Sequence, residues 1–138
     1  MKKQLNSCML VFGQAGRFEG FRLSKITCEY FEISPGKMPV KEFIEALDAS
    51  TRRKFYFTVD LLREFGHRLG EPHAKYFGNS IFELRFMGRE GAVRILYFFF
   101  HQNKAIFTNG FLKKTNGTPE RELESAVKRR RYYNATHP

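Results

Sequence analysis

Residues 81–115 read IFELRFMGREGAVRILYFFFHQNKAIFTNGFLKKT, and this stretch predicts three consecutive β-strands. In the first of them, residues 81–87, apolar and charged side chains alternate. Alternation with a period of two places the apolar side chains on one face of a strand and Glu83 and Arg85 on the other. Because these two charges share a face, we expect them to pair.

The other two predicted strands follow after short breaks. Residues 88–91 break the pattern as a hairpin loop would, and residues 93–100 then form a nearly continuous apolar run. After a predicted turn at 101–103, residues 105–112 form the third strand. Strands rich in Phe, Ile, Val and Tyr fit a packed, pleated surface, so we expect a well-packed sheet.

Cations are placed on all three strands or at their ends. They are Arg85, Arg94, Lys113 and Lys114. An isolated charge is costly to bury, so we expect these four side chains to face one solvated surface. For a single cation, the simplest interpretation is an ordinary exposed residue. Three adjacent strands that each contribute cations favour a phosphate-binding surface.

The segment before this stretch predicts one strand and a pair of helices. Residues 27–34 alternate loosely, as a strand would, and Pro39 suits the first turn of a helix with one apolar face. Ser50 or Thr51 could cap a second helix, which Gly66 would end. We interpret residues 70–79 as a loop and a turn that lead into the central strands.

A further helix is predicted after the central strands. Thr118 would cap it, Pro119 would take its first position, and Glu120 would lie in its first turn. The run 128–131 would place cations at the C-terminal end, where they complement the helix dipole. The predicted order is therefore β-α-α-β-β-β-α. This order is typical of a small α+β domain, with a mainly antiparallel sheet packed by an N-terminal helical hairpin and a C-terminal helix.

Length and composition limit the classes of function. The chain has 138 residues, so we predict one domain at 27–138, preceded by an extension at 1–26 whose structure the sequence leaves open. The net charge of +10 favours an anionic partner such as nucleic acid, an acidic protein or an anionic membrane. Cys8 and Cys28 have no metal-binding spacing, and together with the absence of a long apolar run they predict a cytoplasmic protein.

Six short motifs, in their order and spacing, resemble the RelE/ParE toxin superfamily. Within it, the chain is most similar to the phage-derived HigB-like branch of type II toxin–antitoxin systems. The motifs are PVKEF at 39–43, LREFG at 62–66, ELR at 83–85, VRILY at 93–97, GFLKKT at 110–115 and TPEREL at 118–123. The resemblance implies a compact toxin fold and, for most relatives, cleavage of messenger RNA on the translating ribosome.

The chain departs from this pattern at two positions. Many members of the branch carry His where Asn109 stands, so an acid–base role at that position is lost. Glu120 lies near the position at which several RelE relatives carry Tyr. Tyr132, Tyr133 and His137 could substitute for it only if the C-terminus folds back.

Metal-independent RNA cleavage uses the ribose 2′-OH as nucleophile, and it needs cations to stabilise the charge that develops on the phosphate. We expect Arg85 and Arg94 to clamp the scissile phosphate, because guanidinium groups match two phosphate oxygens. Lys113, Lys114 and Lys75 would add charge, and one of the lysines could transfer a proton if its neighbours lower its pKa.

Other titratable residues are weaker candidates. His67, His73 and His101 lie in predicted loops or turns, where a solvated His is the simpler interpretation, and His137 is next to the C-terminus. No cluster of Cys, His and acidic residues has the spacing of metal ligands, so the sequence gives no reason to invoke a metal or another cofactor.

Further cations would position ribosomal RNA and messenger RNA through phosphate contacts that do not specify sequence. They are Arg52, Arg53, Lys54 and Arg63 on the helical hairpin, and Lys128, Arg129, Arg130 and Arg131 on the last helix. The resemblance also implies a cognate acidic antitoxin that binds the basic face.

Two other functions remain open. A ParE-like inhibitor of DNA gyrase would share the fold but act by binding, without hydrolysis. The cations Arg85, Arg94, Lys113 and Lys114 favour the nuclease over this alternative. A non-catalytic basic RNA- or protein-binding remnant of phage origin is the third interpretation, which the missing His at position 109 keeps open.

Overall fold

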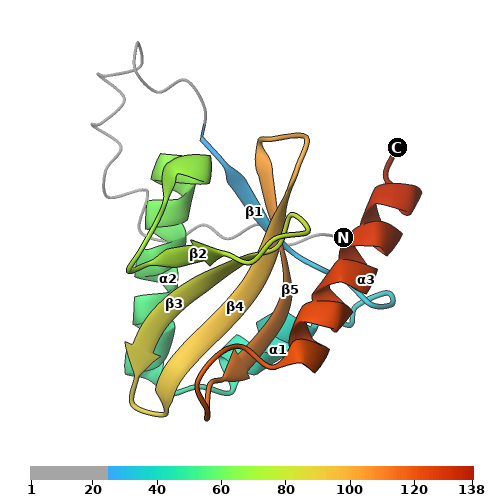
Figure 1. Cartoon of the computed structure of the whole chain (residues 1–138). Helices are drawn as coiled ribbons and strands as arrows, with labels where there is room; N and C mark the ends of the chain where they lie inside the picture. Colours follow the sequence, from blue (N-terminus) through green and yellow to red (C-terminus); the bar gives the residue numbers. More distant parts are fainter. Residues whose placement is uncertain (1–24) are drawn as a thin grey trace.

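The computed structural model describes residues 25–138, so residues 1–24 of the predicted extension lie outside the described residues. It confirms the predicted α+β class (Figure 1). Along the chain the elements are β1 (Thr27–Tyr30), α1 (Pro39–Glu45), α2 (Ala49–Phe65), a single 3₁₀ turn η2 (Gly66–Arg68), β2 (Ala74–Tyr76), β3 (Phe82–Gly88), β4 (Gly91–Phe100), β5 (Lys104–Leu112) and α3 (Glu120–Thr136).

The five strands form one sheet in the order β1-β5-β4-β3-β2. The three predicted central strands are its middle, and they pair antiparallel as expected. β1 pairs with β5 in parallel, which the predicted order did not specify. β2 is a strand where we predicted only loop and turn, and it pairs antiparallel with β3. A strand of three residues is too short to show a period in sequence.

The sheet is covered on both faces (Figure 1). One core lies under α1 and α2, and it includes Val93, Ile95 and Tyr97 of β4. The other core lies under α3, and it includes Leu96 and Phe98 of the same strand. Burial on both faces explains why β4 reads as a continuous apolar run. α3 packs on β4 and β5, which leaves the β2–β3 part of that face open.

A capping carboxylate begins α2, and a glycine ends it. Asp48 is the N-cap, and its carboxylate accepts a hydrogen bond from the Ser50 N–H, so the predicted caps Ser50 and Thr51 are wrong. Asp48 is preferred there because a carboxylate oxygen can satisfy a free N–H of the first turn. Gly66 ends the helix with a φ of 55°, as predicted, because glycine adopts this conformation without a steric penalty.

α3 begins and ends later than its sequence signals indicate. Pro119 occupies the N-cap position, and the Thr118 hydroxyl donates to the Glu83 carboxylate, so the prediction that Thr118 is the cap is wrong. The helix continues to Thr136, and its last turn contains no basic residue. The cations at 128–131 therefore lie within the helix, and the helix dipole does not explain them.

Candidate functional site

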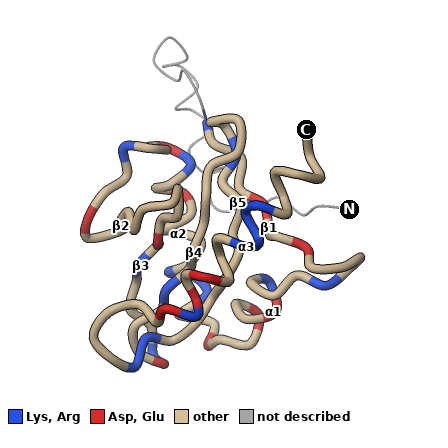
Figure 2. The backbone as a smooth tube through the Cα atoms, turned by 45° about the vertical axis from the view of Figure 1, so that its right-hand side comes forward, with Lys and Arg blue, Asp and Glu red and all other residues tan. Residues whose placement is uncertain are grey.

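The register of the sheet brings predicted site residues together on the face that carries α3. Arg85 of β3 is directly opposite Arg94 of β4, and Lys75 of β2 is opposite Glu83 of β3. The N–H of Lys113 donates to the Ala92 carbonyl, which continues the β4–β5 pairing one residue beyond β5. Since side chains alternate along each strand, the register places these cations on one face. Figure 2 shows acidic positions interspersed among the basic ones.

Glu83 joins the two arginines. Its Oε1 lies 3.0 Å from Nε of Arg85 and 3.6 Å from Nε of Arg94, and its other oxygen accepts a hydrogen bond from the Thr118 hydroxyl. The Glu83 side chain is 0% exposed, while the side chains of Arg85 and Arg94 are 21% and 13% exposed. The Glu83–Arg85 pair was predicted. Both arginines are less exposed than expected for side chains that face a solvated surface, because a buried carboxylate compensates their charge.

Arg94 is the more enclosed of the two arginines. Its Nη1 donates to the Val93 carbonyl at 3.0 Å, and its Nε has no hydrogen-bond partner of good geometry within the described residues. Burial lowers the pKa of its guanidinium from the usual value, and the charge of Glu83 partly opposes this effect. Because Nε is buried and lies beside the Glu83 carboxylate, an anionic ligand would have to bind the terminal nitrogens of this guanidinium.

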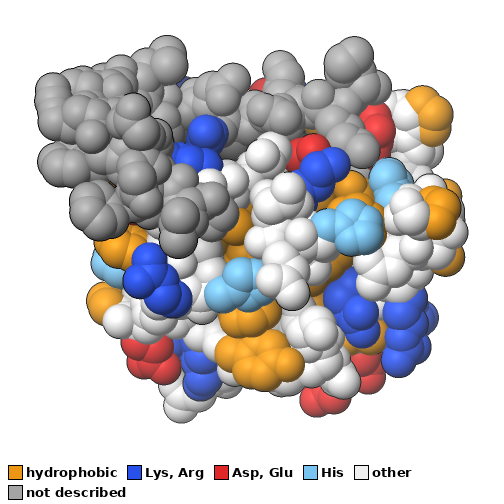
Figure 3. Space-filling view, turned by 90° about the horizontal axis from the view of Figure 1, so that it is seen from above, with side chains coloured by type: hydrophobic (Ala, Val, Ile, Leu, Met, Phe, Trp, Pro, Cys, Tyr) orange, Lys and Arg blue, Asp and Glu red, His pale blue; other side chains and the backbone are white. Residues whose placement is uncertain are grey.

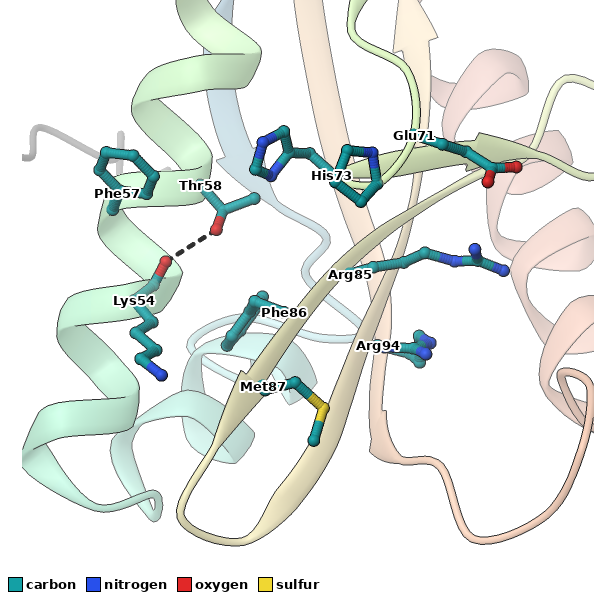
Figure 4. Close-up of a pocket in the computed structure, with 10 residues that line it drawn as sticks. Lys54, Phe57, Thr58, Glu71, His73, Arg85, Phe86, Met87 and Arg94 are labelled. Atoms are coloured by element: carbon teal, nitrogen blue, oxygen red, sulfur yellow. Dashed lines mark hydrogen bonds between the residues drawn. The ribbon is translucent and has the colours of Figure 1, made fainter.

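A pocket of about 510 Å³ lies at the edge of β3, past the end of β2 (Figure 4). It is lined by side chains of α2, such as Lys54 and Thr58, and by Arg85 and Arg94 of the central strands. His73 also lines it, and the His73 carbonyl accepts a hydrogen bond from the Arg85 N–H. Figure 4 shows Arg85 and Arg94 extending to the side of the strands opposite α2.

Sequence reasoning missed two residues of this region, since it interpreted His73 as an ordinary loop residue and Thr118 as a helix cap. Lys75 was predicted as a site cation, but not as a residue of a strand. Their positions depend on the pairing of β2 with β3 and on the course of the segment before α3. Neither produces a spacing that can be read from the sequence.

Apart from Lys54, which lines the pocket beside Arg85 and Arg94, the remaining predicted RNA-binding cations are distributed over other surfaces. Arg52, Arg53, Lys54 and Arg63 belong to α2, which covers the opposite face of the sheet. Arg52 donates from Nη1 to the Leu47 carbonyl at 2.5 Å and so joins α2 to the preceding loop. Lys54 and Arg53 are exposed, as is Lys114 beyond β5.

α3 contributes both exposed and structural cations. Lys128 and Arg131 are exposed, and Arg130 is half-buried. Arg129 donates from Nη1 to the Thr108 carbonyl at 2.6 Å and lies over the Phe31 ring at 5.8 Å. Burial lowers the pKa of its guanidinium from the usual value, with Glu122 opposing the effect. Arg129 therefore fastens α3 to the sheet.

Tyr133 and His137 do not complete the arginine site. Their rings stack at 3.8 Å, and Tyr133 packs edge-on against Phe98 and Phe100. Phe98 is four residues from Arg94 along β4, which corresponds to about 13 Å. The two residues therefore lie toward the other end of the strand, so the C-terminus does not fold back to bring them to the arginines.

The Asn109 side chain is hydrogen-bonded to α3. Its amide donates to Glu122 Oε1 at 3.0 Å, and the residue is only 7% exposed. Its carbonyl oxygen is buried and has no hydrogen-bond partner within the described residues. An amide at this position can orient Glu122, but it has no group that transfers a proton at neutral pH.

Within the part of the chain that the structure describes, no helix is both long and apolar enough to cross a membrane. Over the same residues, no group of three or more His, Cys, Asp or Glu side chains could hold a metal ion.

The chain matches a known protein family. The sequence profile of a family described as "Phage derived protein Gp49-like (DUF891)" matches residues 42–131. This region begins in α1 and ends within α3, so it contains Glu83, Arg85, Arg94 and Lys113. No curated protein matches the chain.

Proposed function

Because the chain belongs to the Gp49-like family of phage-derived, toxin-like proteins, we propose that it is the toxin of a type II toxin–antitoxin system. In this proposal it is a metal-independent endoribonuclease that cleaves messenger RNA on the ribosome, as in the HigB-like branch. The observation that carries the proposal is the opposition of Arg85 and Arg94 on neighbouring strands, on the sheet face where α3 packs on β4 and β5.

The two arginines would bind the scissile phosphate. A guanidinium donates two parallel hydrogen bonds to phosphate oxygens, and two of them can stabilise the charge of a pentacoordinate intermediate. The ribose 2′-OH would lose its proton and attack the adjacent phosphorus. The bond to the 5′-oxygen would then break, that oxygen would take up a proton, and a 2′,3′-cyclic phosphate and a 5′-OH would result.

Lysines would assist this reaction. Lys113 lies one residue beyond β5, on the same face as the arginines, and Lys75 lies opposite Glu83. Both can stabilise charge on the phosphate. The exposed Lys114 would contribute at longer range.

Docking would depend on the charge of the whole molecule. With a net charge of +10, exposed cations such as Arg53, Lys54 and Lys128 can contact ribosomal RNA phosphates without reading sequence. The same charge suits an acidic antitoxin as the partner that neutralises the toxin.

The test is to induce the chain in a bacterial host and map messenger RNA 5′ ends. Wild-type protein should arrest growth and produce cuts within translated codons. Arg94→Ala should abolish both the growth arrest and the cuts. Arg94→Lys should keep only part of the cleavage activity, because an ammonium has one charge but no planar fork of donors. Lys37→Ala is the matched control, since Lys37 is an exposed loop cation whose ion pair among residues 25–138 is with Glu42.

Circular dichroism of the purified variants separates loss of function from loss of fold. Growth arrest with intact messenger RNA and DNA damage would instead indicate inhibition of gyrase. Normal growth with a folded wild-type protein would indicate a non-catalytic binding protein. A folded Arg94→Ala variant that still cuts messenger RNA would remove Arg94 from the site.

A further inference from the structure

A second hollow lies at the end of the sheet that carries the β4–β5 turn. It has a volume of about 560 Å³, and side chains of η2, β2, β3, β4 and two turns line it. Figure 3 views the molecule from this end and shows histidine side chains beside apolar ones. We call it the aromatic groove and define it by His67, Tyr76, Phe82, Phe99 and His101.

The rings of the groove form a continuous series. Tyr76 and Phe82 have centroids 4.7 Å apart, and Phe82 and Phe99 have centroids 5.1 Å apart. His67 stacks on Phe99 with centroids 3.7 Å apart and an interplanar angle of 26°. Tyr76 is 54% exposed, and His67 is exposed as well. The groove therefore offers aromatic surface to a flat ligand and leaves room for it.

Polar groups surround these rings. The Ser80 N–H donates to the Tyr76 hydroxyl at 3.1 Å, which restrains the ring. Ser80 and Gln102 line the groove with φ values of 65° and 66°, and His101 has a φ of 54°. Non-glycine residues in the left-handed region are uncommon, and they often mark functional turns. Their hydroxyl, amide and imidazole groups can donate to or accept from a base edge.

The charges near the groove favour an anionic ligand. The described residues that line the groove include no carboxylate. Arg68 follows His67 and is exposed, and Lys75, which precedes Tyr76, is exposed on the other face of β2. Aromatic rings that accept bases, with cations nearby that accept phosphates, are the elements of single-stranded nucleic-acid sites.

We propose that the aromatic groove stacks an unpaired nucleobase of single-stranded RNA. The proposal deepens the proposed function and rests on it, because RNA is the substrate assigned there. It concerns binding of the strand beside the cleaved phosphate and involves no group that transfers a proton.

The groove and the arginine site can hold the same strand. Lys75 and Tyr76 are adjacent residues of β2, so their side chains point to opposite faces, one toward each site. Phe82 and Arg85 are three residues apart on β3, which corresponds to about 10 Å. A strand whose phosphate is bound by Arg85 and Arg94 would therefore reach the groove within a few nucleotides, around the edge of β2.

The test uses purified full-length protein and fluorescence anisotropy with a short single-stranded DNA. Because DNA has no 2′-OH, binding is measured without cleavage. Tyr76→Ala and His67→Ala change exposed rings, so we expect both proteins to fold. Loss of base stacking costs about 1–3 kcal/mol per base, so their affinity should fall by about fivefold to a hundredfold.

The matched control is Phe65→Ala. Phe65 is also an exposed aromatic residue, at 44%, but it lies at the end of α2 and lines neither the groove nor the pocket beside Arg85 and Arg94. Its affinity should equal that of the wild type. An oligonucleotide with abasic sites should bind the wild type more weakly, and it should bind Tyr76→Ala and the wild type equally.

The outcomes separate this inference from the proposed function. If the groove variants bind DNA more weakly, but the wild-type protein leaves messenger RNA intact in cells, the groove is supported and the nuclease is rejected. Unchanged affinity of folded Tyr76→Ala and His67→Ala would reject the groove, even if Arg94→Ala abolishes cleavage. If the groove variants keep their affinity for DNA but no longer bind a protein partner, the groove is a peptide-binding site and the proposal is overturned.

Discussion

Glu83 is a carboxylate without solvent exposure, and it connects three elements of the site. It binds Arg85 on its own strand, Arg94 on the next strand and Thr118 before α3. The alternation of β3 predicts the first contact, because Glu83 and Arg85 share a face. The contact with Thr118 joins residues 35 positions apart, and no local pattern indicates it.

The first prediction concerns this carboxylate. Glu83→Gln should lower the free energy of unfolding by about 3 kcal/mol, because it leaves two partly buried guanidiniums without their counter-charge. Urea denaturation measures the loss. In an Arg85→Gln background the same substitution should lower the free energy of unfolding by less, since one of the two uncompensated guanidinium charges is absent. Equal losses in both backgrounds would mean that Glu83 contributes through packing alone.

The second prediction concerns Tyr133. Burial, with the nearby Glu29 carboxylate, raises its pKa from 10.0 to about 12. Below pH 10 the folded and unfolded forms are both protonated, so this contribution to stability is complete. Between pH 10 and 12 only the folded form keeps the proton, so the free energy of unfolding should fall as pH rises.

Tyr133→Phe tests this linkage because it keeps the ring and removes the titrating group. The decline between pH 10 and 12 should become shallower by up to about 1.4 kcal/mol per pH unit, the value for one proton. Equilibrium unfolding at a series of pH values measures it. Cys28 and Tyr97 also have raised pKa values, so part of the decline should remain. Identical pH profiles for the two proteins would contradict the assignment.

At the scale of elements, α3 divides a run of cations into two roles. Ala126, Arg129 and Tyr133 follow at the spacing of one helix face, and this face lies against the sheet. Lys128 and Arg131 point to solvent. In the sequence the four basic residues at 128–131 look equivalent, because the position of the sheet decides which of them is buried.

The third prediction follows from this division. Arg129→Gln should lower the free energy of unfolding by about 1.5–3 kcal/mol, because it removes a charged donor from the Thr108 carbonyl. Lys128→Gln should change stability by less than about 0.5 kcal/mol, as expected at an exposed site. Thermal unfolding of both proteins checks the difference. Equal melting temperatures would place Arg129 with the solvent-exposed cations.

At the scale of the whole molecule, the net charge of +10 governs association with nucleic acid. Each neutralised phosphate of a single strand contributes about 0.7 to the slope of log affinity against log salt concentration. The fourth prediction is that affinity for single-stranded DNA falls steeply with salt, and that Arg94→Ala reduces the slope by about this amount. Tyr76→Ala should weaken binding without changing the slope, because stacking releases no counterions.

The composition and period of the chain were enough to predict the class of fold. The central strands, the helical hairpin and the last helix all follow from local spacing, since strand and helix periods are properties of neighbouring residues. The shared face of Glu83 and Arg85 follows for the same reason. The position of the cations on adjacent strands could also be predicted, because hairpin turns make consecutive strands neighbours.

Other features depend on contacts between distant segments. The strand β2 exists because β3 pairs with it, and the parallel pairing of β1 with β5 joins the two ends of the sheet. The burial of Glu83, the structural role of Arg129 and the assembly of the aromatic groove arise from packing across the sheet. Such contacts leave no period in the sequence, because they are set by which surfaces meet when the apolar faces are buried together.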